Sequence, residues 1–345
     1  MTRAALLVLL LQLSACNNND TQTINYGPGV PLGSENLGVI VNDDDPASLR
    51  IADYYMEKRR IPAKNLLHVH FKPGEQIMRP EVFRTLKAKV DAVTPKNVQA
   101  YVLTWMAPYR VGCMSMTTAF AAGFNEAFCV QGCKLTRKSP YFDSDSRRPW
   151  DDFGWRPTIM LAGETFADVK ALIDRGIASD HTNPEGTGYL VSTTDRARNA
   201  RARYYNGILL MQSDRFKFKL IQRNTLKYRS DVMFYFTGLA KVPDIASNQF
   251  LPGAIADHLT SSGGELTGSS QMSSLRWLQA GATGSFGAVV EPCAFVQKFP
   301  RPDIVINRYL NGETLIESYW KSVEMPGQGV FIGEPLATPF STSPD

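Results

Sequence analysis

The chain has 345 residues and a formal net charge of +4, with 43% hydrophobic and 20% charged residues. These proportions exclude a disordered or fibrous protein and are typical of a globular protein that buries a large core. The small net charge creates no strong electrostatic field, so no nucleic-acid partner is expected.

The first residues predict export and lipid anchoring. Arg3 precedes an apolar run from Ala4 to Leu13, which is too short to span a bilayer but suits a signal peptide. Residues 13–16 read Leu-Ser-Ala-Cys and resemble a bacterial lipobox. Residues 1–16 are therefore predicted to hold a lipoprotein signal, with Cys16 as the lipid attachment site. A plain secretory signal is the alternative.

Residues 17–34 follow as a polar tether without hydrophobic periodicity. Asn17, in place of an acidic residue after the Cys, resembles lipoproteins sent to the outer membrane of Gram-negative cells. The sequence therefore predicts a protein of the cell envelope, held by its lipid at the periplasmic face of the outer membrane. Its expected partners are the membrane and an envelope protein or polysaccharide.

Residues 35–345 alternate between strand and helix patterns, with no internal repeat. The first helix is expected to begin at Pro46 with Asp45 as its N-cap. The short apolar runs predict strands at 37–42, 65–70, 98–104, 158–162, 188–193, 232–236 and 286–290. Such alternation predicts a single α/β domain, a three-layer α/β/α sandwich with a mostly parallel sheet.

More specific predictions can be made for three segments. Residues 105–156 lack periodicity and are expected to form a long functional or bridged loop beside the sheet. A long helix is predicted from Asp195 to Met211, with the basic run 196–203 on its solvated surface. The alternation of Phe and Lys at 216–221 predicts an edge strand.

Four cysteines remain after Cys16. Cys113, Cys129 and Cys133 lie in the irregular segment, and Cys293 follows a predicted strand. An oxidising periplasm permits disulfides, so a bridge among the first three is expected. The connectivity does not follow from the sequence, and the C-x-x-x-C spacing without a nearby His is a weak match to a zinc site.

Cys293 and His258 form the sharpest catalytic hypothesis. Each lies at the edge of an apolar segment, and a thiolate nucleophile requires a neighbouring base. Ser262 and Gly263, in the turn from Ser261 to Gly264, could supply backbone donors to an oxyanion. The alternative is a buried or disulfide-bonded cysteine, a structural histidine and a plain turn.

Two further patterns suit a metal ion. Asp43, Asp44 and Asp45 end the first predicted strand and could bind a hard divalent cation, although capping explains Asp45 and solvation the others. His68 and His70 share one face of the second predicted strand, but two ligands are too few. No organic cofactor is predicted.

Several segments resemble a family of bacterial envelope proteins from species that carry the exosortase protein-sorting system. The resemblance covers nearly all of the mature chain but implies no known activity. It rests on Val41 to Pro46, Tyr54-Tyr55, Arg60 to Pro62, Phe250 to Thr260, Gly281 to Cys293 and Gly333 to Leu336.

A fainter resemblance is to gingipain-type cysteine peptidases of the caspase-like fold. In those enzymes a G-H-G segment follows one central strand and a Cys ends the next. Here Phe236 to Leu239 contains no His, and Asp257-His258 stands where the Cys is expected. The departure implies either a catalytically inactive relative or a rearranged site using His258 and Cys293. The first hypothesis is therefore a binding or assembly lipoprotein, and the second a cysteine hydrolase.

Overall fold

The structure is a computed structural model that describes residues 32–130, 132–211 and 216–342. Leu32 is already buried, and the Ser34 hydroxyl donates a hydrogen bond to the Arg59 carbonyl at 2.6 Å. The packed chain therefore begins before the expected end of the tether at residue 34. The predicted signal peptide and Cys16 lie outside the described residues.

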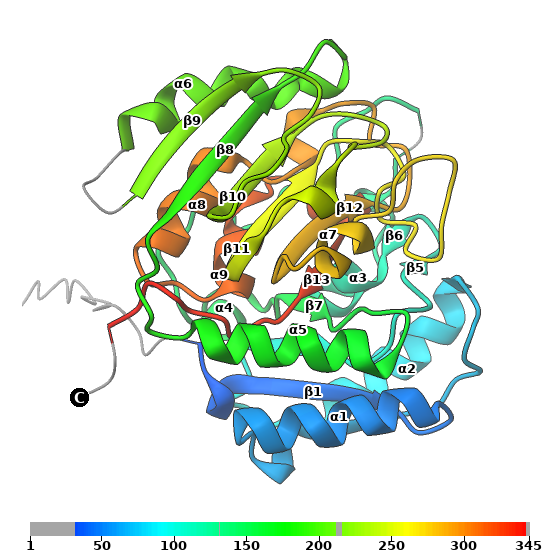
Figure 1. Ribbon diagram of the computed structural model, residues 1–345. Helices are drawn as coiled ribbons and strands as arrows, with labels where there is room; N and C mark the ends of the chain where they lie inside the picture. Colours follow the sequence, from blue (N-terminus) through cyan, green and yellow to red (C-terminus); the bar gives the residue numbers. More distant parts are fainter. Residues whose placement is uncertain (1–31, 131, 212–215, 343–345) are drawn as a thin grey trace, which may run out of the picture.

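One ten-stranded sheet runs through the described part of the chain (Figure 1). All neighbouring strands pair in parallel except β12 and β13, which are antiparallel. The predicted α/β class with a mostly parallel sheet is confirmed. In spatial order the strands are β2 (Leu66–Val69), β1 (Leu37–Asn42), β4 (Ala100–Leu103), β7 (Thr158–Met160), β13 (Gly329–Gly333), β12 (Gly284–Ala288), β11 (Phe250–His258), β10 (Val232–Thr237), β8 (Gly186–Ser192) and β9 (Phe216–Gln222).

The same strand order occurs on either side of the central β13–β12 pair. From the edge inward, the strands on one side are β2, β1, β4 and β7, and those on the other side are β9, β8, β10 and β11. On each side, counting only the strands of this sheet, the second strand in chain order lies outermost and is followed by the first, the third and the fourth. A 2-1-3-4 order of this kind is typical of doubly wound α/β folds. The strand order is thus repeated within the fold, although the amino-acid sequence shows no internal repeat.

Helices cover both faces of the sheet and complete the three-layer sandwich. Figure 1 shows α1 and α5 side by side over one face. On β11, His258 contacts Trp277 of α7, whereas the adjacent Asp257 contacts Arg201, so these neighbours point to opposite faces. The α-helices are α1 (Pro46–Arg59), α2 (Pro80–Val93), α3 (Met116–Ala122), α4 (Pro149–Phe153), α5 (Phe166–Ser179), α6 (Tyr205–Ile208), α7 (Leu275–Gln279), α8 (Pro302–Leu310) and α9 (Leu315–Ser322).

The start of α1 follows from local chemistry, as predicted. The Asp45 side chain accepts a hydrogen bond from the Ala47 N–H at 2.9 Å, and Pro46 occupies the first helical position. Proline suits this position because its missing N–H would have no partner within the helix. The helix ends at Arg60, which adopts a left-handed conformation with φ 52°.

The segment 105–156, expected to form a long functional or bridged loop, is bridged and largely irregular but also contains regular elements. The segment contains α3 and α4, and its strands β5 (Arg110–Val111) and β6 (Met114–Ser115) form a small sheet with β3 (Ile77–Met78). Residues Met116 to Ala121 of α3 are buried, and the helix packs against β4, β7 and β13. A helix buried all round has no amphipathic period, which is why the pattern did not reveal it.

The helix predicted from Asp195 to Met211 is not one regular α-helix, although Asp195 does cap its start by accepting from the Arg198 N–H at 3.1 Å. The chain instead forms the 3-10 helix η4, the short α6 and the 3-10 helix η5. Asn199 binds the end of β8, because its side chain accepts from the Thr193 N–H at 3.0 Å and donates to the Ser192 hydroxyl at 3.0 Å. These side-chain bonds tie the start of η4 to β8. The bounds are η4 (Arg198–Tyr204) and η5 (Leu209–Met211).

Arg201 is buried, so the basic run is not wholly a solvated surface. Its guanidinium is 1% exposed and lies 2.5 Å from the carboxylate of Asp257, which is equally buried. It also donates to the carbonyls of Thr237 at 3.0 Å and Pro300 at 3.2 Å. A guanidinium is buried at tolerable cost only where a countercharge and acceptors meet it. This ion pair joins η4 to the ends of β10 and β11.

Removing one partner of this pair should destabilise the protein strongly. We expect Arg201→Met to lower the free energy of unfolding by about 3–5 kcal/mol, because it leaves the buried Asp257 carboxyl without its countercharge. Burial already raises the pKa of Asp257. Urea unfolding followed by circular dichroism measures the change.

The matched control is Arg196→Met, in the same run but exposed, which should change the free energy by less than about 0.5 kcal/mol. Adding Asp257→Asn to Arg201→Met should restore part of the loss. Equal, small effects of Arg201→Met and Arg196→Met would contradict this account of the pair.

Candidate functional site

The predicted base, His258, is an interior residue whose two ring nitrogens are both engaged. It ends β11, opposite Thr237 of β10, and is 1% exposed. Its Nδ1 accepts a hydrogen bond from the Trp277 indole at 3.0 Å, and its Nε2 lies 3.1 Å from the Met272 carbonyl. Burial lowers the pKa of His258 to about 3. The ring is therefore neutral, and its lone pair is already occupied.

The predicted nucleophile, Cys293, is disulfide-bonded to Cys133. A disulfide sulfur carries no thiolate and cannot attack a carbonyl. The backbone N–H of Cys293 donates to the Glu291 carboxylate at 2.7 Å, and Cys293 has φ 59°. The structure thus does not bring Cys293 and His258 together as nucleophile and base, because each is bonded to other groups.

A second disulfide joins Cys113 to Cys129. The predicted bridge within the segment 105–156 is confirmed for this pair, whereas Cys133 reaches outside the segment to Cys293. The two bridges tie the segment to itself and to the chain that follows β12. They contribute stability mainly by restricting the unfolded chain, and the bridge to Cys293 closes the longer loop.

The turn predicted to hold an oxyanion uses two of its backbone donors within the fold. The Ser262 N–H donates to the Gln271 side chain at 3.1 Å, and the Gly264 N–H donates to the Ala288 carbonyl at 2.8 Å. Gly263 lies against His258, and its carbonyl accepts from Ser274 at 2.6 Å. The turn thus fastens the end of β11 to β12, and Ser262 and Gly264 present no free N–H.

Two adjoining hollows lie between the loops that follow β7, β10 and β11. Their volumes are about 420 Å³ and 530 Å³, and they share Glu164, Val242, Met272 and Arg276. Val242 and Met272 contribute apolar wall to both hollows. Lys241 and Arg276 carry positive charge, and Glu164, Asp168 and Asp244 carry negative charge. This position, beyond strand ends, is where open α/β sheets bind ligands. The sequence analysis missed the hollows because they exist only after three distant loops meet.

The two metal hypotheses converge on one place, which the sequence did not indicate. The Asp43 carboxylate contacts His68 Nδ1 at 2.8 Å and His70 Nε2 at 3.3 Å, and Asp44 contacts His70 Nδ1 at 3.1 Å. Asp45 only caps α1. Among the described residues, no group of three or more His, Cys, Asp and Glu side chains is arranged to hold a metal ion. The predicted cation site at Asp43 and Asp44 is thus not formed in this hydrogen-bonded state.

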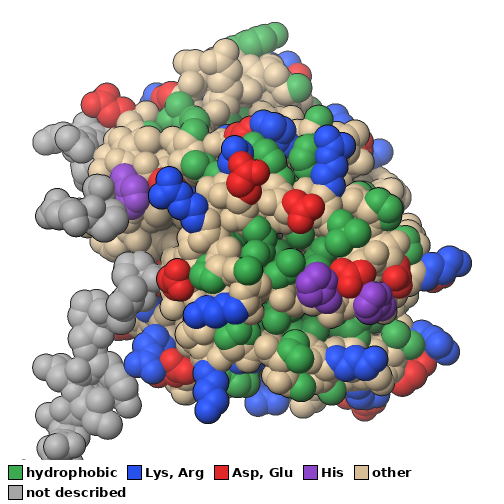
Figure 2. All heavy atoms as spheres, turned by 90° about the horizontal axis from the view of Figure 1, so that it is seen from below, with side chains coloured by type: hydrophobic (Ala, Val, Ile, Leu, Met, Phe, Trp, Pro, Cys, Tyr) green, Lys and Arg blue, Asp and Glu red, His purple; other side chains and the backbone are tan. Residues whose placement is uncertain are grey.

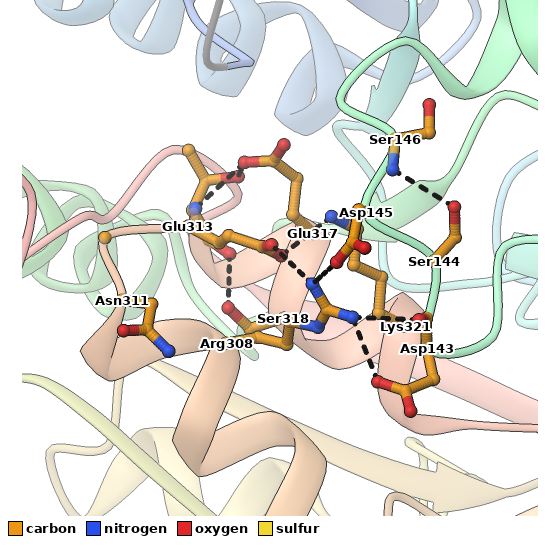
Figure 3. Close-up of polar contacts among 12 residues, drawn as sticks. Asp143, Ser144, Asp145, Ser146, Arg308, Asn311, Glu313, Glu317, Ser318 and Lys321 are labelled. Carbon is orange, nitrogen blue, oxygen red and sulfur yellow. Dashed lines mark hydrogen bonds and ion pairs between the residues drawn. The ribbon is translucent and has the colours of Figure 1, made fainter. Parts of the chain in front are cut away.

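A further ionic network, around Arg308 of α8, was also missed (Figure 3). Arg308 contacts Asp145 at 2.6 Å, Asp143 at 3.0 Å and Glu313 at 3.4 Å, and Glu313 pairs with the fully buried Lys321 at 2.9 Å. Burial raises the pKa of Glu313 and lowers that of Lys321. The network joins the segment 105–156 to α8 and α9, so its role is structural.

Comparison with protein-family models and with curated proteins finds no match for the chain. None of the helices in the described ranges has the length and apolarity needed to cross a bilayer. The resemblances to the exosortase-associated family and to gingipain-type peptidases therefore stay predictions from sequence. The function has to be inferred from the geometry.

The buried state of His258 should appear in the pH dependence of stability. The ordinary histidine pKa is about 6.5, and the folded value is about 3. Between these values the unfolded chain binds a proton that the folded protein does not, so the free energy of unfolding falls as the pH falls. From pH 7.5 to 5.0 we expect the wild type to lose about 2 kcal/mol more than His258→Gln.

Urea unfolding of both proteins across this pH range tests the prediction. The matched control is His181→Gln, which alters an exposed histidine and should keep the wild-type pH profile. The test compares how steeply the free energy of unfolding changes with pH in the two proteins. A difference between wild type and His258→Gln that is the same at every pH does not bear on the prediction. Parallel profiles would show that His258 protonates in the folded state.

Proposed function

We propose that this protein is a lipid-anchored component of the bacterial cell envelope that binds exported material and assists its sorting or assembly without catalysing a reaction. The single observation that carries the proposal is the disulfide between Cys133 and Cys293. It removes the only nucleophile that the sequence pattern suggested for a cysteine hydrolase.

Support for the compartment comes from the cysteines. All four cysteines in the described ranges are in disulfides. Such pairing is typical of proteins that fold outside the cytosol, where thiols are oxidised. This agrees with the signal peptide and lipobox predicted at residues 1–16, although those residues lie outside the described ranges.

Support for a non-catalytic role comes from the strand ends where the gingipain-like resemblance would place the catalytic residues. His258 is buried and neutral there, and Asp257 is paired with Arg201 behind it. A general base needs a free lone pair within reach of a substrate proton. Here the nitrogens of His258 are engaged by Trp277 and Met272, and Asp257 lies against Arg201.

The hollows between the loops provide the surface that we assign to the partner. Met272 offers an apolar contact, and Lys241 and Glu164 lie at the same surface with opposite charges. Apolar pockets beside charges of both signs suit a polypeptide better than a polysaccharide, whose surface is mainly hydroxyl groups. We therefore favour an exported polypeptide as the bound material.

Thiol labelling tests the absence of a cysteine nucleophile. We expect no iodoacetamide labelling of Cys293 in the folded, non-reduced protein between pH 5 and 9, and labelling after reduction. Mass spectrometry of tryptic peptides locates the modified residue. Cys133→Ser, which frees Cys293, is the positive control. Rapid labelling of the untreated wild type would favour the cysteine hydrolase.

Site-specific cross-linking tests the binding surface. A photoreactive amino acid in place of Thr267, an exposed residue of the hollow, should yield a cross-linked polypeptide in cells of the source organism. The control position is Val93, which is 65% exposed and lies in neither hollow. Equal products from both positions would contradict a specific surface, and a carbohydrate adduct would identify a polysaccharide partner.

A further inference from the structure

The strand β9 forms one edge of the ten-stranded sheet (Figure 1). It pairs in parallel with β8 from Phe216 to Gln222, and in the described ranges no other strand of this sheet lies next to it. The edge strand of a sheet presents a row of backbone N–H and C=O groups that the sheet leaves unpaired. The outer side of β9 is therefore a template on which another extended chain can pair.

The two faces of β9 differ in character. Phe216 and Phe218 are buried, with their ring centres 5.4 Å and 6.4 Å from that of Phe234 on β10. The alternating residues Lys217 and Lys219 are exposed on the other face. A shift by one residue would bury both lysines, so the register of β9 against β8 is fixed. The edge is thus a preformed surface with its lysines on one side.

Positive charge gathers along this edge and in the loop that follows it. The sequence from Phe216 to Ser230 has five basic residues and no acidic residue. All five are exposed: Lys217, Lys219, Arg223, Lys227 and Arg229. Figure 2, by contrast, shows basic and acidic side chains interspersed on the face that it views. This stretch therefore carries one sign of charge, which the small net charge of the whole chain does not reveal.

Two acidic side chains from neighbouring segments border the positive stretch. Asp231 accepts a hydrogen bond from the Tyr189 hydroxyl at 2.7 Å, and Asp244 pairs with Lys227 at 3.2 Å. Both carboxylates are thus engaged in contacts of the fold itself. Lys219 lies over the Tyr189 ring, with Nζ 5.9 Å from the ring centre, which keeps its ammonium group beside the edge of the sheet.

The lysines of β9 make a second copy of this chain an unsuitable partner. If two copies joined through β9 in one continuous sheet with common faces, Lys217 and Lys219 of both copies would lie on the same face. Like charges on neighbouring strands destabilise their pairing, and lysine on an edge strand is a common protection against self-association. A partner strand with carboxylates on that face forms opposite-charge pairs instead.

We propose that β9 binds an extended acidic segment of another polypeptide, which adds to the edge of the sheet with its carboxylates beside Lys217 and Lys219. In this mode of recognition the backbone hydrogen bonds supply affinity and alternate side chains supply specificity. The residues between the carboxylates are apolar, because they extend the face on which Phe218 and the half-buried Leu220 lie. The strand β9 lines neither hollow, so this proposal does not rest on the binding role assigned to the hollows.

A polypeptide fits this edge better than an anionic lipid surface. Phosphate headgroups neutralise lysines, but they carry no alternating N–H and C=O groups at the spacing of a strand, about 3.3 Å per residue. An acidic strand meets both the positive charge and the unpaired backbone groups of β9. The observations therefore favour the polypeptide, and the lipid surface is one outcome of the test.

Fluorescence anisotropy with a defined peptide tests the proposal. The probe is a fluorescein-labelled nonapeptide in which Glu alternates with Val, and the protein is the full-length chain in a neutral detergent. We expect saturable binding, and mass spectrometry should show slower hydrogen exchange of the β9 amides when the peptide is present. Lys217→Glu/Lys219→Glu should weaken binding by about tenfold or more, because favourable cross-strand pairs become repulsive.

Two controls separate strand pairing from general attraction between charges. Lys89→Glu/Lys96→Glu makes the same change of charge at exposed lysines elsewhere and should leave the affinity unchanged. A peptide whose backbone nitrogens are all methylated keeps its charge but has no N–H groups to donate, so it should not bind. A peptide with Lys in place of Glu should bind the Lys217→Glu/Lys219→Glu variant better than the wild type, which shows that the variant retains its edge strand.

Three results overturn the proposal: no saturable peptide binding by the wild type, equal losses in the two double variants, or undiminished binding of the methylated peptide. If no peptide binds but exchange of the β9 amides slows on vesicles of phosphatidylglycerol and not on vesicles of phosphatidylcholine, the edge serves an anionic lipid surface instead.

Discussion

The buried ion pair between Arg201 and Asp257 is the constraint on which the second half of the sheet depends. Asp257 lies on β11, and Arg201 reaches it from η4 while also donating to the Thr237 carbonyl at the end of β10. A charge so deeply buried must be met by its partner, so η4 cannot move away from the strand ends. His258, on the opposite face of β11, is enclosed in turn by Trp277. The strand ends therefore form a closed interior instead of an open catalytic crevice.

Because these strand ends are closed, a ligand has to bind at another surface. With His258 neutral and covered, and with Cys293 joined to Cys133, the accessible surface lies farther out, in the hollows lined by Val242 and Met272. These hollows combine apolar side chains with charges of both signs, which suits recognition more than bond breaking. The proposed binding role rests on this surface.

The first half of the sheet is organised differently at its strand ends. There the buried group is Asn42, an uncharged amide that satisfies three backbone partners and leaves the charged residues on the surface. Asp43 and His68 consequently meet each other in solvent-accessible positions. The two halves share one strand order, yet one buries its ionisable groups and the other exposes them.

The sequence by itself determined the α/β class, the capped start of α1 at Asp45 and the edge strand β9, because these depend on local periodicity and on single side chains beside the backbone. Only the tertiary structure decided which cysteine met Cys293, which arginine of the basic run was buried, and that the Asp43 and His68 patterns form one cluster. Each of these depends on residues far apart in the chain. The spacing of residues along the sequence does not predict such contacts, because they form only when the order of strands in the sheet brings the strand ends together.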